Sequence, residues 1–199
     1  PDPGFEKLIA EGEAAPVDGW DFSWFDGRAT EQRPPWGYAR LLGDAIAHAT
    51  SALDLQTGGG EVLAGIRRAP SLLAATESWP PNAILARDRL EPLGATVVRA
   101  PDDGPLPFAD RSFDLVTSRH PTVTVWPEIA RVLRPGGLYL SQQIGLGSNR
   151  ELYEFLMGPQ PLGAARDPAA HAAQARACGL MVEHLEPASL LVEFFDIAA

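Results

Sequence analysis

The stretch LDLQTGGG, residues 53–60, decides the fold of this chain. It reads as the end of a short apolar strand that carries an acid, Asp54, followed by a glycine-rich turn and a helix that begins near Glu61. Glycine lacks a Cβ and adopts positive φ, so such a turn lets the backbone approach a small ligand closely. A helix that starts there also aims its free N–H groups at that ligand. The stretch therefore predicts a nucleotide-like cofactor at the end of a strand.

Outward from this stretch, short apolar runs alternate with helical patterns, which predicts a parallel sheet covered by helices on both faces. The last two apolar runs are separated by only three residues, so we expect them to pair as an antiparallel hairpin. The expected fold is a Rossmann-like, doubly wound α/β domain with a mixed sheet of the seven-strand type. Strands are expected near 51–55, 71–76, 95–99, 113–117, 137–144, 180–186 and 190–196, and helices near 36–50, 60–68, 80–92, 125–133 and 166–178.

The first 35 residues differ from the rest, because they hold several aromatic residues among Gly, Asp and Pro without a clear period. We interpret residues 1–35 as an aromatic extension that packs on the domain or forms a lid, and residues 36–199 as the main domain. Three tryptophans could wall an apolar substrate pocket: Trp20, Trp24 and Trp36. Because the sequence stops inside an apolar run, we expect the last strand of the natural protein to continue past Ala199.

Composition narrows the functional classes. The 199 residues are 45% hydrophobic, enough for one full core, and no apolar run is long enough to span a membrane. The formal net charge of −10 disfavours a nucleic-acid substrate without excluding it, because phosphate contacts need clustered Lys and Arg. Cys178 is the only cysteine, so no internal disulfide or cysteine metal cluster can form, and a cytoplasmic setting follows. We expect no metal site, and the oligomeric state stays open.

The residues after the glycine turn discriminate between cofactors. Glu77 ends the next expected strand, where a carboxylate can accept both hydroxyl protons of a ribose. A dinucleotide fingerprint needs a third glycine, but Leu63 occupies that position. Glu61 adds a negative charge that would repel a pyrophosphate. These features disfavour an NAD-dependent oxidoreductase and favour S-adenosylmethionine, which carries no phosphate.

Over roughly residues 36–187 the sequence resembles the class I S-adenosylmethionine-dependent methyltransferases, in the branch called methyltransferase type 11. The resemblance implies methyl transfer from S-adenosylmethionine to a small-molecule acceptor. Four segments carry it in the family's order and spacing: LDLQTGGG at 53–60, ATE at 75–77, DDGPLPF at 102–108 with SFDLV at 112–116, and EIARVLRPGG at 128–137.

The resemblance also implies roles for individual residues. The turn would hold the methionine end of the cofactor, Glu77 the ribose, and the acids after the third strand the adenine. The end of the fourth strand would border the reactive methyl group and the substrate entrance. The implied cofactor-binding residues are Asp54, Gln56, Thr57, Gly58, Gly60, Glu77, Asp102, Asp103, Ser118 and Arg119.

Two positions leave alternatives open. Gln56 stands where the family has its first glycine, so the chain is either an adapted enzyme or a catalytically weakened binding domain. His120 is either a general base or a loop residue that shapes the pocket, since positioning alone can supply much of the rate of methyl transfer. An RNA methyltransferase is a third hypothesis. The sequence does not identify the methyl acceptor.

Overall fold

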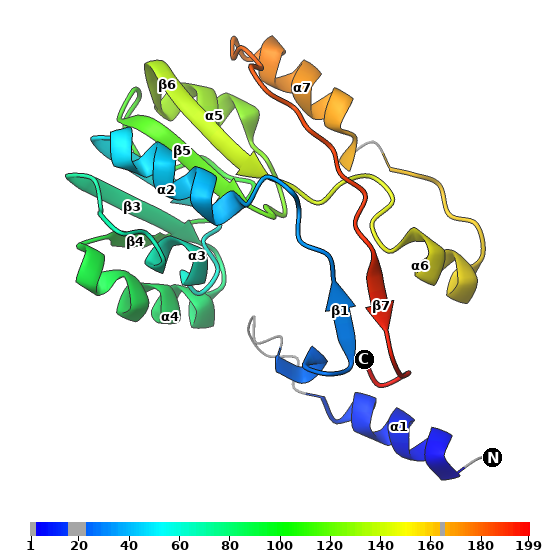
Figure 1. Cartoon of the computed structure of the whole chain (residues 1–199). Helices are drawn as coiled ribbons and strands as arrows, with labels where there is room; N and C mark the ends of the chain where they lie inside the picture. Colours follow the sequence, from blue (N-terminus) through cyan, green and yellow to red (C-terminus); the bar gives the residue numbers. More distant parts are fainter. Residues whose placement is uncertain (1–2, 16–22, 164–165) are drawn as a thin grey trace. The chain divides into compact units, whose positions relative to one another are not determined.

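The computed structural model describes residues 3–15, 23–163 and 166–199, and the chain divides into two compact units (Figure 1). The larger unit comprises residues 36–187. The smaller unit combines residues 1–35 with residues 188–199. The C-terminal segment therefore belongs to the same unit as the N-terminal extension.

The larger unit is built on a five-stranded parallel sheet of order β4-β3-β2-β5-β6. Its two central strands, β2 and β5, pair with Leu55 opposite Ser118, so both strands end at the same edge. This is the α/β fold with flanking helices that the alternating pattern predicts. The strands are β2 (Ser51–Leu55), β3 (Leu72–Glu77), β4 (Thr96–Arg99), β5 (Phe113–Arg119) and β6 (Leu133–Gln142).

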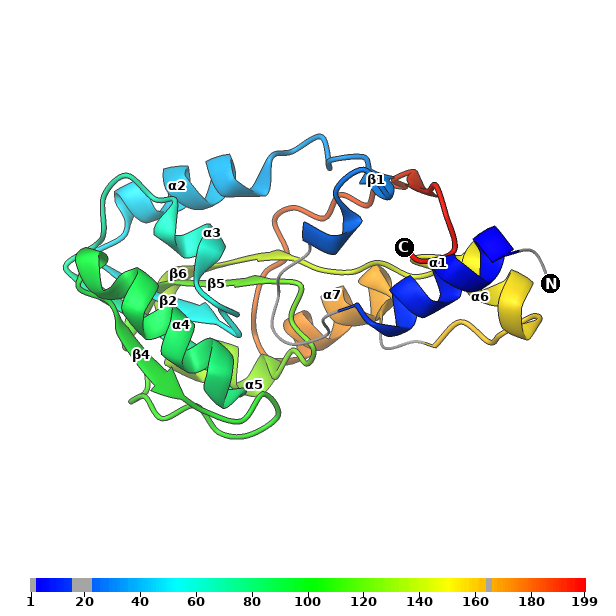
Figure 2. The ribbon, with the colours of Figure 1, turned by 90° about the horizontal axis from the view of Figure 1, so that it is seen from below.

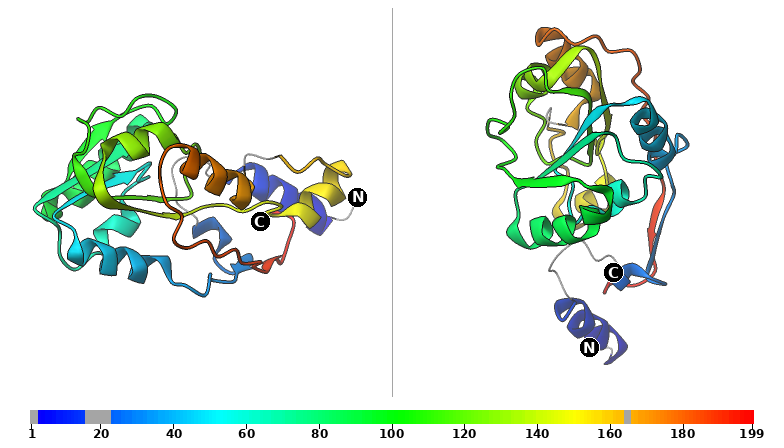
Figure 3. Two further views of the ribbon diagram at one scale, coloured as in Figure 1. Left: turned by 90° about the horizontal axis from the view of Figure 1, so that it is seen from above. Right: turned by 90° about the vertical axis from the view of Figure 1, so that its left-hand side faces the viewer.

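Helices cover both faces of this sheet (Figures 1 and 2). Successive strand side chains point to opposite faces, so Ala52 joins the core under α2, α3 and α4, whereas Leu53 joins the core under α5 and α7. Figure 3 shows these layers from two further directions. The helices and 3-10 turn of this unit are α2 (Tyr38–His48), α3 (Glu61–Ala64), α4 (Pro80–Leu90), η2 (Glu91–Leu93), α5 (Trp126–Val132), α6 (Arg150–Met157) and α7 (Pro168–Ala177).

Local sequence explains where these helices begin and which side they bury. In α2 the buried residues Tyr38, Leu42 and Ile46 are spaced four apart, which places them on one face. Both α4 and α7 begin with proline, whose fixed φ suits the first turn of a helix. Asp167 caps α7 by accepting a hydrogen bond from the Ala169 N–H at 2.9 Å.

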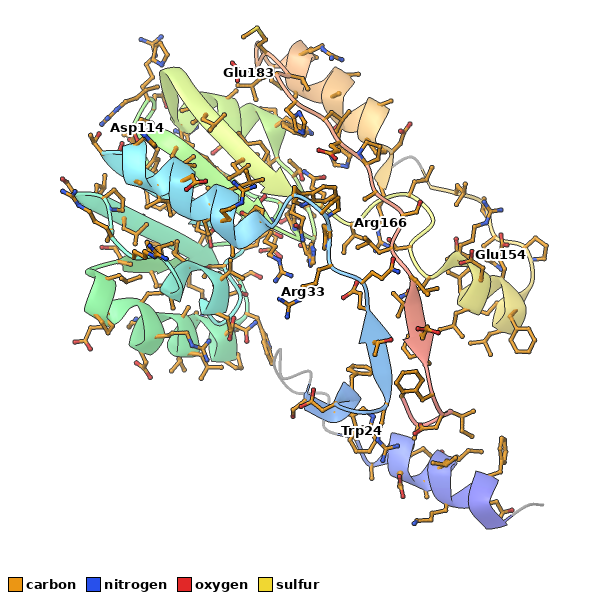
Figure 4. The ribbon with its side chains drawn as sticks, in the orientation of Figure 1. Trp24, Arg33, Asp114, Glu154, Arg166 and Glu183 are labelled. Atoms are coloured by element: carbon orange, nitrogen blue, oxygen red, sulfur yellow. The ribbon has the colours of Figure 1, made fainter. Side chains whose placement is uncertain are left out.

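At the amino edge of the sheet, Asp114 joins β5 to β2 (Figure 4). Its carboxylate accepts hydrogen bonds from the Thr50 hydroxyl at 2.5 Å and from the Ser51 N–H at 3.0 Å. These bonds and the Arg134 guanidinium lower the pKa of Asp114, against a rise from burial. The contact fixes the register that brings the opposite ends of both strands together.

The smaller unit is a two-stranded antiparallel sheet with a helix. In it β1 (Ala29–Glu31) pairs with β7 (Val192–Phe194), preceded by α1 (Pro3–Glu13) and the 3-10 turn η1 (Ser23–Phe25). Arg28 forms ion pairs with Glu11 at 2.8 Å and with Asp196 at 3.2 Å. The Trp24 indole donates to the Ala198 carbonyl oxygen at 2.7 Å. These contacts tie the two ends of the described chain into one unit.

Three expectations about elements are corrected. The expected hairpin of 180–186 with 190–196 does not form: 180–186 has no strand, and β7 pairs instead with β1. The main sheet has five parallel strands among the described residues rather than the mixed seven-strand type. The helix expected over 60–68 is α3, a single turn. Leu180 and Val182 pack against the core under α5 and α7, which explains why that run is apolar without being a strand.

Among the described residues, no helix combines the length and apolarity that crossing a membrane requires.

Candidate functional site

The glycine turn lies at the carboxyl edge of the sheet, directly after β2. Gly58 and Gly60 adopt φ of +63° and +80°, a region that disfavours residues with a Cβ. A Cβ on Gly60 would also lie 3.0 Å from Leu90 of α4. The turn is held to β3 by the Thr57 N–H, which donates to the Thr76 carbonyl at 2.9 Å. Backbone conformation therefore favours glycine at both positions, and packing against Leu90 favours it further at Gly60.

Glu77 meets this turn from the end of β3. Its carboxylate accepts hydrogen bonds from the Gly58 N–H at 2.8 Å and from the Trp79 N–H at 2.9 Å. The side chain is buried, and burial raises its pKa against these two bonds, with the Asp102 carboxylate adding to the rise. The structure thus brings the acid and the turn into direct contact, as the strand-end argument requires.

The structure shows the surroundings of Glu61 and Leu63, the two residues that argue against a dinucleotide cofactor. Glu61 forms an ion pair with Arg89, so its negative charge is compensated and repels a pyrophosphate less than the sequence suggests. Leu63 is fully buried in the core under α2 and α4. In a dinucleotide-binding turn the third glycine lets the helix pack closely on the strand. Here the Leu63 side chain fills that position as part of the core.

Asp54 is buried at the end of β2. Its Oδ1 accepts a hydrogen bond from the Thr117 hydroxyl of β5 at 2.6 Å. Burial raises the pKa of Asp54 from 3.8 to about 6, against the lowering effect of that hydrogen bond. A carboxyl group of this kind is sensitive to a positive charge placed beside it.

Gln56 adopts φ of +54°, so it accepts the left-handed conformation in which the family has glycine. Its side chain turns to the segment after β5. Gln56 Nε2 donates to the Val123 carbonyl at 2.6 Å, and Oε1 accepts from the Thr122 N–H at 2.6 Å. The Thr122 hydroxyl in turn donates to Asp102 at 2.9 Å. Gln56 therefore links the glycine turn to the β5–α5 segment and, through it, to the acid after β4.

A small pocket opens beside this chain of contacts. It combines polar atoms with an apolar floor, and the segment 101–106 forms one wall. Asp103 is exposed in the same segment. The lining includes Gln56, Thr76, Asp102, Leu106, Val123 and Ile129. The pocket lies at the carboxyl ends of β2 and β3 and beside the segment that follows β4.

The wall of this pocket is fixed by an ion pair from α5. Arg131 donates to Glu128 Oε2 at 2.7 Å, to the Leu106 carbonyl at 3.0 Å and to the Phe108 carbonyl at 2.8 Å. Glu128 Oε2 also accepts from the Leu106 N–H at 2.6 Å. The hydrogen bonds from Arg131 lower the pKa of Glu128, and those to Glu128 and Asp110 raise the pKa of Arg131. Neither residue was singled out as a site residue from the sequence.

The three residues proposed at the end of β5 have different environments. Ser118 is buried, and its hydroxyl lies 2.7 Å from the Tyr139 hydroxyl and 3.1 Å from that of Ser141. Arg119 is exposed. His120 adopts φ of +52° just beyond the strand, and its Nε2 lies 2.9 Å from Gln142 Nε2. Only Arg119 and His120 therefore lie where a ligand could reach them.

The tryptophans proposed as a pocket wall belong to different parts of the chain. Trp36 belongs to the larger unit, and its indole N–H donates to Gln142 Oε1 at 2.9 Å. Trp24 belongs to the smaller unit, where the Arg28 guanidinium lies 4.5 Å from its ring centre (Figure 4). Trp20 lies outside the described residues. Trp36 therefore contacts the residue that ends β6.

Sequence reasoning missed Gln142 and Thr122. Asp54 and Glu77 were selected as polar residues at the carboxyl end of a strand. Gln142 ends β6, so the same rule applies to it. No sequence signal points to Thr122, because its partners Gln56 and Asp102 come from two other strand ends.

Part of the larger unit matches a known protein family. Residues 53–141, which run from within β2 almost to the end of β6, match the family described as "Methyltransferase domain". A search of curated proteins finds no significant match.

Several solved structures share the fold. A candidate sarcosine dimethylglycine methyltransferase from Galdieria sulphuraria superimposes with a TM-score of 0.56 at 19% identity, covering 72% of this chain and 59% of its own. A chain from a complex of a Haloferax volcanii methyltransferase activator and a candidate methyltransferase gives 0.54 at 22% identity, covering 87% and 76%. An S-adenosylmethionine dependent methyltransferase from Mesorhizobium loti gives 0.53 at 18% identity, covering 75% and 84%. The chain thus spans less than two thirds of the Galdieria protein's length.

Proposed function

We propose that this chain, in which residues 53–141 match the family described as "Methyltransferase domain", transfers a methyl group from S-adenosylmethionine to a small-molecule acceptor. The observation that carries the proposal is the contact between Glu77 and Gly58. The Glu77 carboxylate can accept hydrogen bonds from ribose hydroxyls. Gly58 belongs to a turn whose backbone can approach a ligand closely, so the contact brings both features together.

The residues present suit this cofactor. A Cβ on Gly60 would lie 3.0 Å from the Leu90 side chain, so glycine lets the turn pack closely on α4. Three carboxylates lie around the turn and the pocket: Asp54, Glu77 and Asp102. Carboxylates accept hydrogen bonds from hydroxyl and amino groups and favour a positive charge nearby. The hydroxyl, amino and sulfonium groups of S-adenosylmethionine match this set of acceptors, whereas a phosphate group does not.

When bound, the cofactor supplies a methyl group activated by a sulfonium leaving group. In our proposal Glu77 accepts hydrogen bonds from the ribose hydroxyls, and Asp102 accepts one from the adenine amino group. The Glu128–Arg131 pair holds the segment beside the adenine in place. Asp54 lies close to the methionine end and stabilises its positive charge. Positioning by these groups is the main catalytic contribution that we assign to the protein.

The acceptor is a small molecule in this proposal because the chain is acidic. A net charge of −10 opposes the approach of a polyanion such as RNA. Arg119 ends β5 and His120 follows it, at the same edge of the sheet as the glycine turn, so we place the acceptor beside them.

Isothermal titration with S-adenosylmethionine and S-adenosylhomocysteine tests cofactor use, and release of S-adenosylhomocysteine in a screen of small acceptors tests turnover. Binding with turnover is the expected result. Binding without turnover on any acceptor would favour the alternative of a catalytically weakened binding domain. Absence of binding to either compound would contradict the proposal, and salt-dependent binding of RNA would favour the RNA methyltransferase instead.

A further inference from the structure

Three side chains of the larger unit form a hydrogen-bonded series at the carboxyl edge of the sheet. The Trp36 indole nitrogen lies 2.9 Å from Gln142 Oε1, and Gln142 Nε2 lies 2.9 Å from His120 Nε2. The His120 N–H also donates to the Gln142 carbonyl oxygen at 2.7 Å. The histidine is therefore held by Gln142 through both its ring and its backbone.

The chemistry of the three groups fixes the direction of each hydrogen bond. An indole N–H can only donate, so the atom of Gln142 that faces Trp36 must be the amide oxygen. The other end of the amide is then the NH₂ group, which can only donate to His120. His120 Nε2 must consequently be the unprotonated nitrogen that accepts. The Trp36 indole N–H alone therefore fixes the orientation of the Gln142 amide.

A neutral imidazole with an accepting Nε2 carries its proton on Nδ1. Burial lowers the pKa of His120, and the neighbouring Arg119 charge adds to that lowering, so the ring is neutral at pH 7. Among the described residues Nδ1 has no hydrogen-bond partner. The ring therefore has one free function, an N–H donor, and no free lone pair with which to remove a proton.

This donor lies where the proposed function places the methyl acceptor. Leu55 of β2 pairs with Ser118 of β5, so the segment that leads into the glycine turn and the segment that begins at His120 leave the same edge of the sheet. The exposed Arg119 adds a positive charge next to the histidine. A donor flanked by a cation recognises an anionic oxygen. A hydrogen bond to an oxygen lowers its nucleophilicity, so this oxygen serves recognition and is not the atom that is methylated.

We propose that His120 holds a carboxylate oxygen of the methyl acceptor through its Nδ1–H, and that Trp36 and Gln142 are positioning residues that fix this tautomer. The inference rests on the proposed function for the identity of the bound molecule as an acceptor. It replaces the hypothesis that His120 is a general base.

The tautomer can be measured without cofactor or turnover. In protein labelled with ¹⁵N-histidine, long-range ¹H–¹⁵N correlation at pH 7 reports which ring nitrogen of His120 is protonated, and the signal that disappears in His120→Asn gives the assignment. Asn tolerates the positive φ at this position. The expected result is a proton on Nδ1. A proton on Nε2, or a charged ring at pH 7, would overturn the inference.

Variants test the series itself. In Gln142→Glu a carboxylate faces His120 and must accept, so the ring proton moves to Nε2 or the ring becomes charged. Trp36→Phe removes the fixed donor, so the Gln142 amide can turn over and the two tautomers mix. Gln143→Glu adds the same charge one residue along and should leave the tautomer unchanged. An unaltered tautomer in both Gln142→Glu and Trp36→Phe would overturn the positioning role.

Acetate is the probe for the carboxylate subsite. Titration should shift the His120 Nδ1–H signal in a saturable manner and leave that of His48 unchanged, with about tenfold weaker binding in Gln142→Glu. An unchanged His120 signal would overturn the subsite. If acetate binds and S-adenosylmethionine does not, the proposed function is wrong and the anion subsite is supported. If S-adenosylmethionine binds and acetate does not, only the anion subsite is wrong.

Discussion

At the scale of single residues, Gln56 determines how the site is closed. Its positive φ costs about 1–2 kcal/mol relative to glycine, and its side chain forms two hydrogen bonds, with the Val123 carbonyl and the Thr122 N–H, that glycine would lose. At about 0.5–1.5 kcal/mol each, these bonds equal or exceed the backbone cost. Gln56 is therefore explained as a residue that fixes the segment after β5.

We predict that Gln56→Gly accelerates hydrogen exchange of the Thr122 amide by about tenfold, since roughly 1.4 kcal/mol of protection is lost with its acceptor. Affinity for S-adenosylhomocysteine should fall or stay equal. The Thr57 amide, which donates to a backbone carbonyl, serves as the internal reference. A large rise in cofactor affinity would instead identify Gln56 as damage to the site.

Asp54 gives the site a pH dependence. Its pKa is about 6 in the folded protein against an ordinary 3.8, so the folded state binds the proton more tightly than the unfolded state. The stability from this proton is complete below pH 3.8 and is lost as the pH rises through 6. A pKa difference of about two units between the folded and unfolded states corresponds to roughly 3 kcal/mol in the free energy of unfolding.

Asp54→Asn should therefore be more stable than the native protein at pH 7.5, and this advantage should shrink towards pH 4. Urea unfolding of both proteins across this range measures it. An advantage that does not vary with pH would show that Asp54 titrates normally.

At the scale of elements, the pair Glu128–Arg131 joins α5 to the segment that follows β4. The arginine uses its planar fork to contact a carboxylate and two carbonyl oxygens at once, a geometry that lysine cannot reproduce. Its partner Glu128 is mostly buried. The pair therefore acts on the position of residues 106–108 more than on the helix itself.

We predict that Arg131→Lys lowers the free energy of unfolding by about 2 kcal/mol, because buried carbonyl oxygens lose their donors. Arg134→Lys is the matched control, since Arg134 donates to one carbonyl and lies 3.8 Å from Asp114. Urea unfolding should show a small effect for the control. Equal effects of the two substitutions would contradict the role of the pair.

At the scale of the whole molecule, the groups assigned to the cofactor all lie in the larger unit, residues 36–187. We predict that a fragment of these residues binds S-adenosylhomocysteine within about threefold of the whole chain, or roughly 0.6 kcal/mol. A folded fragment with much weaker binding would mean that residues 1–35 or 188–199 contribute to the site, as a lid would.

The sequence predicts the sheet well because its central strands are buried on both faces and read as apolar runs. Asp54 and Glu77 follow from such runs, since the ends of parallel strands converge. The run at 180–186 misleads, because Leu180 and Val182 pack on a helical core without strand pairing. Gln142 ends a strand as Glu77 does, so the same rule could have selected it. Arg131 and Thr122 act through contacts between separate elements, which the local sequence pattern does not record.

Calorimetric titration of S-adenosylhomocysteine into the native protein, Glu77→Gln and Glu91→Gln tests the central assignment most directly. Glu91 is exposed at the end of α4, so it controls for the change in charge. With folding of each variant checked by thermal unfolding, the account predicts binding to the native protein and to Glu91→Gln, and at least about tenfold weaker binding to Glu77→Gln. Equal affinity in all three proteins, or binding to none, would contradict it.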